Sequence, residues 1–343
     1  MVFLLELKEN IKKIFNKYDM YIIPAAKFIM ALLSFLILDY SIGYMTKLKS
    51  PVIAFLLAVI CAFLPSGMTI FLLSIFMLLH LYAISAEFAA IVFGVVLLMY
   101  LLYFRFTPKQ GYLLIIVAIL CWFKLPYLIP VAVGLCSGVA SVIPVGFGVI
   151  IYYIVQTASA YETAITNQSV SDSMQRISYI IESLMNNKTM IILVAAFMLT
   201  IIVVYVIRRL KIDNAWTYAI ITGTAIQFVI LLAGQIAFSA KMNLVLMIVG
   251  TLLGAAVGYI CQILFFSVDY KRTEFVQYED DEYYYYVKAV PKINIVNEDV
   301  RVKQINARKT RKANDINDVA RTTSDKSTLG LDSEDDDITM YTK

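Results

Sequence analysis

The sequence predicts an all-α polytopic transmembrane helix bundle of about eight to ten passes, some of them short or re-entrant, with a small β-prone and disordered cytoplasmic tail. The composition indicates this class, because 60% of the residues are hydrophobic and only 16% are charged, against about 45–50% and 25% in a soluble domain. Ten apolar runs lie between Met20 and Phe266. The acidic residues gather in the tail, which holds 16 of 25.

The net charge of +4 combines two regions of opposite sign. Residues 1–266 hold 16 Lys and Arg with 9 Asp and Glu, whereas residues 267–343 hold 13 and 16. An excess of basic residues in a membrane domain is the usual result of positively charged cytoplasmic loops. The balance therefore indicates a lipid bilayer as the partner and gives no indication of nucleic acid.

Residues 1–19 are predicted to form an amphipathic interfacial helix. Apolar residues recur at intervals of three and four, and lysines occupy the other face. Such a helix lies in the membrane surface and is attracted by anionic lipid. The apolar positions are Leu4, Leu7, Ile11, Ile14, Phe15 and Tyr18, and the lysines are Lys8, Lys12, Lys13 and Lys17.

The transmembrane domain is predicted to cover residues 20–266. Three of its ten runs, Pro51–Leu64, Gly111–Phe123 and Pro126–Gly138, have only 13 or 14 residues, while a perpendicular helix needs about 20 to span the hydrocarbon. They are therefore thin passes, re-entrant pairs or helices buried within the bundle. The other seven runs are Met20–Met45, Met68–Ser85, Phe88–Tyr103, Val139–Ala158, Met190–Ile207, Ala215–Phe238 and Met242–Phe266.

The basic residues predict that both termini are cytoplasmic. In that orientation eleven Lys and Arg fall in cytoplasmic segments and six on the opposite side. Residues 159–189 then form an extracytoplasmic segment, in which the apolar residues from Val170 to Leu184 follow helical spacing. We expect this segment to form an amphipathic helix that lies over the bundle.

The tail is predicted to have two parts. Residues 267–296 are rich in Tyr, Val, Ile and Phe and contain the acidic sequence Glu279–Glu282 as a turn, which favours a short β-hairpin. Residues 297–343 have a basic centre at Arg308–Lys312 and an acidic end, and this charged part is expected to be largely disordered. A cytoplasmic protein is the partner that such a tail suits.

Gly250, Gly254 and Gly258 form a tandem G-x-x-x-G motif in the last apolar run. A spacing of four places them on one helical face, where the absence of side chains lets a second backbone approach closely. The motif therefore predicts a helix-packing face. Its partner is either another helix of the same chain or a second copy, which would make a homo-oligomer.

The segment 124–148 concentrates residues that break or weaken helices. Broken helices at membrane depth persist only where protein or water satisfies the backbone, and in transporters such breaks often lie at the substrate site. A proline-kinked hairpin without a binding role is the alternative interpretation. The residues concerned are Pro126, Pro130, Gly134, Gly138, Pro144, Gly146 and Gly148.

Lys27, Asp39 and His80 are ionisable residues inside apolar runs. Lys27 and Asp39 lie about 18 Å apart along one straight helix, so they cannot pair with each other. Titratable groups inside a membrane are often functional, for example in proton relays. His80 is the only histidine, and a structural role near a helix end is the competing interpretation.

The sequence has no pattern typical of an enzyme. One histidine excludes a His–His metal site within the chain, and neither G-x-S-x-G nor G-x-x-x-x-G-K-[ST] occurs. The four cysteines lie in or at the ends of apolar runs without a C-x-x-C pair, which is typical of small buried side chains. We expect no catalytic residues, no metal and no cofactor.

The tail string DYKRTEFVQYEDDEYYYYVKAVPK, at Asp269–Lys292, accompanies the strings YFRFTPKQGY and LPYLIPVAVGL. Together they resemble a family of uncharacterised multi-pass membrane proteins from anaerobic Gram-positive bacteria. The similarity covers Met20 to about Lys292, and the tail string is its specific part. The resemblance implies a bacterial plasma membrane and a cytoplasmic tail. It implies no activity, so no functional residue follows from it.

Two functions fit these features. A transporter or permease-like component for an unidentified solute is favoured by the broken segment, the short runs and the polar residues in the membrane. The alternative is a scaffold or anchor of the cell envelope that recruits cytoplasmic partners through its tail, which the Tyr-rich and charged parts of the tail favour. The two functions can coexist in one protein.

Overall fold

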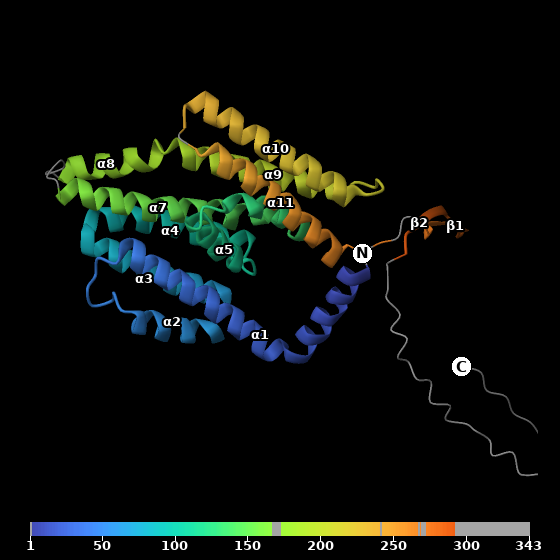
Figure 1. Cartoon of the computed structure of the whole chain (residues 1–343), viewed down its shortest axis with the longest axis horizontal. Coiled ribbons are helices and arrows are strands. Elements are labelled where there is room, and N and C mark those ends of the chain that lie inside the picture. Colours follow the sequence, from blue (N-terminus) through green and yellow to red (C-terminus); the bar gives the residue numbers. More distant parts are fainter. Residues whose placement is uncertain (1, 167–172, 241, 267, 269–271, 292–343) are drawn as a thin grey trace, which may run out of the picture. The chain divides into compact units, whose positions relative to one another are not determined.

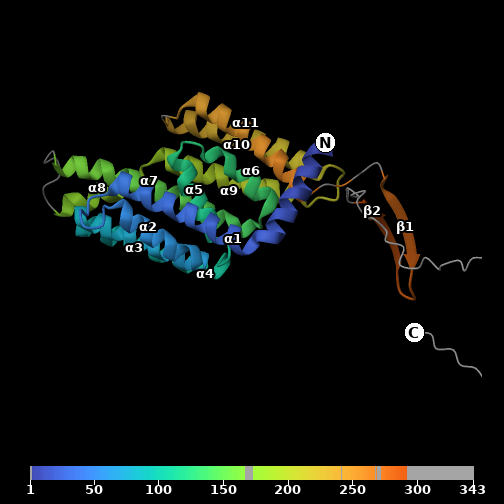
Figure 2. The ribbon, with the colours of Figure 1, turned by 60° about the horizontal axis from the view of Figure 1, so that its bottom comes forward.

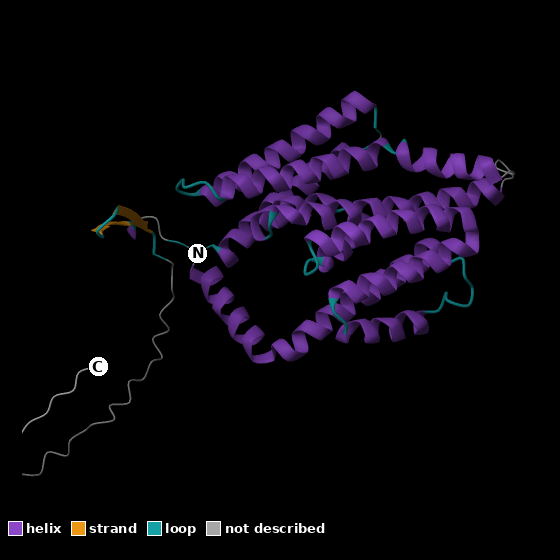
Figure 3. Ribbon diagram, turned by 180° about the vertical axis from the view of Figure 1, so that it is seen from behind, coloured by secondary structure: helices purple, strands orange, loops and turns teal. Residues whose placement is uncertain are grey.

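The computed structural model describes residues 2–166, 173–240, 242–266, 268 and 272–291, and helices form almost all of this part (Figure 3). Seven of the described helical segments are long and apolar enough to cross a membrane. The helical class of the fold is therefore confirmed. These segments are Leu7–Ile42, Ser66–Ile84, Ala86–Phe106, Val139–Thr166, Met174–Arg208, Ala215–Phe238 and Leu244–Phe265, and three shorter apolar helices are Pro51–Phe63, Gly111–Trp122 and Pro126–Cys136.

Helix α1 (Val2–Ile42) contains one break. Its backbone leaves the helical conformation at Tyr18 (φ −124°, ψ 22°), and Pro24 follows in the second limb. The predicted interfacial helix, residues 1–19, is the limb before the break. Its apolar side chains are uncovered, with Leu7 41% and Ile14 55% exposed, as a helix that lies in a membrane surface requires.

Helices α2 and α3 pack beside the second limb of α1, and α4 packs against α3 (Figure 1). The short helix α2 presents the small side chains of Ala54, Ala58 and Cys61 to its neighbours, and all three are fully buried. The rings of Phe35 on α1 and Phe76 on α3 meet edge to face at 5.1 Å in the same cluster. The bounds are α2 (Pro51–Phe63), α3 (Ser66–Ile84) and α4 (Ala86–Phe106).

Side-chain caps mark the starts of several later helices. Asn187 accepts a hydrogen bond from the amide of Met190, and Asn243 accepts bonds from the amides of Val245 and Leu246. Such caps satisfy amides that have no partner in the first helical turn. The elements are α5 (Gly111–Trp122), η1 (Pro126–Leu128), α6 (Ile129–Cys136), η2 (Val139–Ser141), α7 (Val142–Thr166), α8 (Ser173–Met185), α9 (Lys188–Arg208), α10 (Ala215–Phe238) and α11 (Leu244–Phe265).

Segment 159–189, predicted to be an extracytoplasmic amphipathic helix, contains the end of α7 and all of α8. Helix α8 packs against both α4 and α7. Ile180 of α8 is fully buried, whereas Met174 is 71% exposed. The helix therefore has one face toward the bundle and one face away from it. Met174 and Ile181, two members of the apolar face that the spacing predicts, lie on the side away from the bundle, with Ile181 48% exposed, so the buried face is rotated from the predicted one.

The outer surface of the long helices is strongly apolar. Leu101, Val229 and Leu252 are each more than 60% exposed, and many other large apolar side chains share this placement. A soluble protein rarely exposes contiguous apolar surface on this scale, whereas hydrocarbon accepts it. The distribution is compatible with a multi-pass membrane protein.

Strands β1 (Glu274–Glu279) and β2 (Tyr284–Ala289) form an antiparallel two-stranded sheet (Figure 2). Asp280 orders the turn, because Oδ1 accepts hydrogen bonds from the amides of Glu282 (2.9 Å) and Tyr283 (2.7 Å). The predicted β-prone part of the tail is confirmed as this hairpin. The tail predicted to be disordered, residues 297–343, lies outside the described residues.

We expect the hairpin turn to depend on pH through Asp280. Hydrogen bonds from the Glu282 and Tyr283 amides, with a third from the Tyr285 hydroxyl, hold the pKa of Asp280 below its usual 3.8. Because the folded-state pKa is depressed, the stabilisation is complete above the unfolded pKa and is lost as the pH falls through the folded one. The amide resonances of Glu282 and Tyr283 in the full chain should therefore change together at acidic pH. An unchanged titration in Asp280→Asn would contradict this assignment.

Candidate functional site

Helices α5 and α6 form a hairpin that enters and leaves the bundle at the same end. Helix α5 runs parallel to α7: an added Cβ at Gly148 would lie 2.7 Å from Val117 Cβ, and further along both helices Cys121 lines the same cavity as Tyr153. Helix α7 starts only six residues after α6 ends at Cys136. The start of α5 and the end of α6 therefore lie at one end of the bundle.

The helices of the hairpin are shorter than a perpendicular membrane pass. Helix α5 has 12 residues, which corresponds to about 18 Å at 1.5 Å per residue, and the hydrocarbon is about 30 Å thick. At the open end of the hairpin, Arg208 Nη2 donates a hydrogen bond to the carbonyl of Ser137 (2.7 Å). Arg208 ends the 21-residue helix α9, so the tip of the hairpin lies toward the start of that helix, inside the bundle.

The broken segment 124–148 forms the tip and return limb of this hairpin. Pro126 starts η1, and Pro130 and Pro144 lie in the first turns of α6 and α7. Proline is tolerated there because a first-turn amide has no helical partner to lose. The chain reverses between α5 and η1, and Ser137–Gly138 links α6 to η2. Around Gly138 the space for a side chain is open.

Glycines bring the return limb against its neighbours. An added Cβ at Gly134 would lie 2.7 Å from Val204 Cβ on α9, and one at Gly146 would lie 2.9 Å from Met198 Cε. Real Cβ atoms do not approach other heavy atoms this closely, so both positions require glycine or a shift of the neighbour. The glycines of the segment therefore serve close helix packing.

Lys124 lies at the tip in the left-handed conformation, with φ 59°. The amide of Lys124 donates to the carbonyl of Cys121 (3.0 Å), and the amide of Leu125 donates to that of Leu120 (2.9 Å). This arrangement ends α5 in the way that a glycine usually would. A non-glycine residue in this region costs about 1–2 kcal/mol, which marks the tip as a place of stored strain.

An open polar cavity of about 680 Å³ lies at this tip. Its walls come from the end of α5, η1, α7, α8, the start of α9 and the segment before α11. Lys124 is the one charged side chain among its described lining residues. The other lining side chains with polar groups are Tyr127, Tyr152, Tyr153, Gln156, Thr157, Ser183, Asn187, Thr189 and Asn243.

The glycine stripe of α11 holds η1 at the wall of this cavity. Added Cβ atoms at Gly250 and Gly254 would lie 2.6 Å from Tyr127 Cδ2 and 2.8 Å from its carbonyl oxygen, and one at Gly258 would lie 2.9 Å from Val131 Cγ1. The amide of Gln227 on α10 donates to the same Tyr127 carbonyl (3.0 Å). Residues of the same chain thus lie against all three glycines, and a homo-oligomer through this face stays a prediction.

The three intramembrane ionisable residues lie away from this cavity. Lys27 Nζ donates to the carbonyl of Leu64 (3.1 Å), which caps the end of α2. Asp39 Oδ1 lies 3.3 Å from His80 Nε2. The structure thus brings Asp39 and His80 together across α1 and α3, and as the sequence predicts it keeps Lys27 apart from Asp39. Lys124 and its polar neighbours were not singled out from the sequence, where Lys124 is only a basic residue between two apolar runs.

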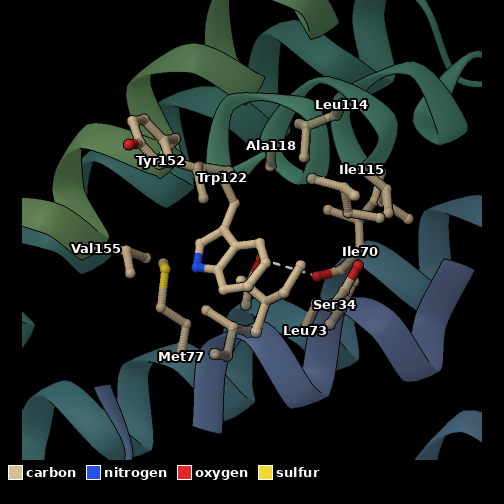
Figure 4. Close-up of a pocket in the computed structure, with 15 residues that line it drawn as sticks. Ser34, Ile70, Leu73, Met77, Leu114, Ile115, Ala118, Trp122, Tyr152 and Val155 are labelled. Atoms are coloured by element: carbon tan, nitrogen blue, oxygen red, sulfur yellow. Dashed lines mark hydrogen bonds between the residues drawn. The ribbon is translucent and has the colours of Figure 1, made fainter. Parts of the chain in front are cut away.

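A second, apolar cavity of about 80 Å³ lies between α1, α3, α5 and α7. The Trp122 indole projects into it beside Met77 and Leu73 (Figure 4). Its walls carry few polar groups, among them Ser34 and Ser74, and Ser74 Oγ already donates to the carbonyl of Ile70 (2.9 Å). Walls of this kind suit an acyl chain and offer little to a polar solute.

The described residues contain no group of three His, Cys, Asp or Glu side chains that could hold a metal ion. The polar cavity instead offers hydroxyl, amide and ammonium groups, which bind a solute by hydrogen bonds and charge. Comparison of the chain with protein-family models, with curated proteins and with solved structures finds no match in any of the three.

Proposed function

We propose that the protein is a transporter or permease-like component of a bacterial plasma membrane that moves a small polar solute. The observation that supports this most is the tip of the α5–α6 hairpin, which lies at the wall of the open polar cavity. Transporters use discontinuous helices at their binding sites, because an interrupted helix exposes backbone groups and lets a short segment move. A hairpin that does not span has the same properties.

The chemistry of the cavity favours an anionic or strongly polar solute. Lys124 supplies a positive charge, and amide donors come from Gln156, Asn187 and Asn243. A volume of about 680 Å³ lies within the range of about 300–1,000 Å³ that is usual for small-molecule sites. A solute of the size of an amino acid or a small organic acid would fit.

The proposed topology has eight traversals with the α5–α6 hairpin re-entrant. The traversing elements are α1, α2, α3, α4, α7, α8–α9, α10 and α11, and their even number puts the two termini on the same side. The basic residues Arg105, Lys109, Arg208 and Arg209 share the side of the termini, which the positive-inside rule makes cytoplasmic. The polar cavity then faces outward.

Flux into vesicles tests the proposal. Purified protein in liposomes should take up members of a panel of radiolabelled organic acids, amino acids and phosphate, and Lys124→Gln should lower the rate for anions at least about tenfold. The reason is the loss of one hydrogen bond with a charged donor, which is worth about 1.5–3 kcal/mol. Glutamine is one atom shorter than lysine and keeps a polar end without the charge, so the tip conformation is disturbed little.

Lys188→Gln is the matched control. Lys188 is exposed at the start of α9 and does not line the cavity, so its replacement should leave the rate within about twofold. An equal loss of transport rate in both variants would show that Lys124 does not contribute to solute binding. Absence of flux for every solute of the panel, with folded protein in the vesicles, would count against transport.

A specific observation also favours the scaffold function. Every residue of β1 and β2 is exposed, including Phe275 at 80% and Tyr286 at 78%, and an isolated two-stranded hairpin is marginally stable in water. A cytoplasmic protein that adds a strand or covers the aromatic face would stabilise it. Deletion of residues 267–343 separates the functions, because a scaffold loses its role in cells while flux through the membrane domain persists.

A further inference from the structure

Two buried ionisable atoms face each other without a hydrogen bond. Asp39 Oδ1 and His80 Nε2 are 3.3 Å apart, yet neither has a hydrogen-bond partner within the described part of the chain. His80 is fully buried and Asp39 is 8% exposed. Buried polar atoms are almost always satisfied, so a pair of this kind calls for an explanation.

The second ring nitrogen shows where the histidine holds its proton. The amide of Met45 donates to His80 Nδ1 (3.3 Å), which makes Nδ1 an acceptor. A neutral imidazole then has its hydrogen on Nε2, the nitrogen that lies 3.3 Å from Asp39 Oδ1. The ring is held in place by Phe76, which meets it edge to face at 4.6 Å.

An additional proton has two places to bind, and both change the contacts of the pair. On Asp39 it turns an acceptor oxygen into a donor. On His80 it must occupy Nδ1, and the amide of Met45 then loses its acceptor. In either case the proton comes from a hydronium ion of the solvent, whose O–H bond breaks as the new O–H or N–H bond forms, and no other covalent bond changes. Protonation of the ring therefore releases the backbone of the loop between α1 and α2.

The charged and titratable groups around the pair come from several elements. Lys49, in the loop between α1 and α2, acts electrostatically on both Asp39 and His80. Tyr44 of the same loop interacts with Ser159 and Glu162 of α7. Other such groups on the surrounding described elements include Glu87 on α4 and Arg176 on α8, which are 4.0 Å apart. Further members are Lys27 and Tyr40 on α1, Lys47 in the loop, Cys61 on α2, Tyr82 on α3 and Tyr161 on α7.

One helix touches both the end of α1, which carries Asp39, and the polar cavity. Ser159 Oγ on α7 donates to the carbonyl of Ser41 (3.0 Å), two residues beyond Asp39. Gln156 and Thr157 of the same helix line the cavity. A change in the loop or at the end of α1 therefore acts directly on a cavity wall.

We propose that Asp39 and His80 form a binding site for one exchangeable proton. If the protein is a transporter as proposed above, this site couples the movement of the solute to the binding and release of a proton. The alternating loss and gain of the Met45 hydrogen bond moves the loop between α1 and α2, and α7 transmits the movement to the cavity.

The single histidine of the chain makes a direct test possible. Full-length protein with ¹⁵N-labelled histidine rings, purified with a tag that lacks histidine and placed in lipid nanodiscs, gives one pair of ring signals. We expect a titration between pH 4 and pH 9. Asp39→Asn should move its midpoint to lower pH by about one unit or more, because the nearby negative charge is lost. Lys49→Gln should move it to higher pH, because a positive charge is lost.

The amide of Met45 is an independent reporter and should shift with the same midpoint as the ring. A ring that does not titrate in folded protein, or a midpoint unchanged in both variants, would overturn the proton site. Flux in vesicles, measured in parallel, separates this proposal from the proposed function. A titrating ring without flux supports the proton site and refutes transport. Flux that a pH gradient does not change, together with a silent ring, supports transport and refutes the proton site.

Discussion

Gly254→Leu is expected to lower the free energy of unfolding by about 3 kcal/mol and to displace the hairpin tip. An added Cβ would lie 2.8 Å from the carbonyl oxygen of Tyr127 and 3.5 Å from Leu128 Cα. Both are backbone atoms, which cannot rotate away as a side chain can. The leucine must therefore push α11 away from η1, and overpacking of this kind costs about 1–3 kcal/mol or more.

The same displacement breaks a second contact. The carbonyl of Tyr127 accepts the hydrogen bond from Gln227, which is fully buried. Loss of this bond leaves a buried amide without a partner, at a further cost of about 1–3 kcal/mol. Because Tyr127 also lines the polar cavity, the variant should change the cavity as well as the stability.

Gly94→Leu is the matched control, because nothing lies within 4 Å of an added Cβ at Gly94 on α4. A helical glycine replaced at an open position should be neutral or stabilising by up to about 1 kcal/mol. Unfolding of both variants by denaturing detergent in mixed micelles, followed by circular dichroism, measures the difference. Equal stability of the two variants would show that the stripe on α11 does not hold η1.

The sequence predicts that the glycine stripe is a helix-packing face, but it does not identify the element that packs against it. Spacing defines a face on one helix, but the partner is set by how the whole chain folds. Here the partner is the return limb of a hairpin about 120 residues earlier in the chain. The glycine stripe and the segment 124–148 are both poor in helix-forming residues. In the fold they pack against each other and form the two sides of one contact.

A re-entrant pair is one of the three alternatives that the sequence leaves for the short runs, and it is the one that we propose for α5 and α6. Length alone shows that 12 or 13 residues fall short of the about 20 that a perpendicular pass needs, and it leaves open whether such a run is a thin pass or a place where the chain turns back. That decision depends on contacts such as the bond from Arg208 to Ser137, which joins residues 71 positions apart. The same limit explains why Lys124 was not singled out: only the reversal after α5 brings it to a cavity.

The pairing of Asp39 with His80 had no signal in the sequence. The two residues belong to different helices and are 41 positions apart, and periodicity within one helix says nothing about its rotation against another. What the sequence does establish is the scarcity of such groups. A membrane domain with so few ionisable residues in its apolar runs has few ways to satisfy any one of them, so a contact between two is informative.

His80→Leu is expected to destabilise the protein by about 3–5 kcal/mol, because it leaves the Asp39 carboxylate buried without its partner. The loss of stability should be smaller at acidic pH, because burying a protonated carboxyl group costs much less free energy than burying a charged one. Asp39→Leu combined with His80→Leu should recover much of the loss, because no unpaired charge remains. The four proteins of this double-mutant cycle are compared by thermal unfolding in nanodiscs at neutral and acidic pH.

The size of the coupling in this cycle separates two roles for the pair. A coupling energy of 1 kcal/mol or more at neutral pH, reduced at acidic pH, means that the two side chains interact through their protonation states, as a proton site requires. Additive losses at both pH values would mean that each side chain only fills space, because no energy depends on the presence of the other. The 3.3 Å separation of Asp39 Oδ1 and His80 Nε2 in a buried setting favours the first result, because a carboxylate and a polar ring nitrogen interact more strongly in a low-dielectric interior than in water.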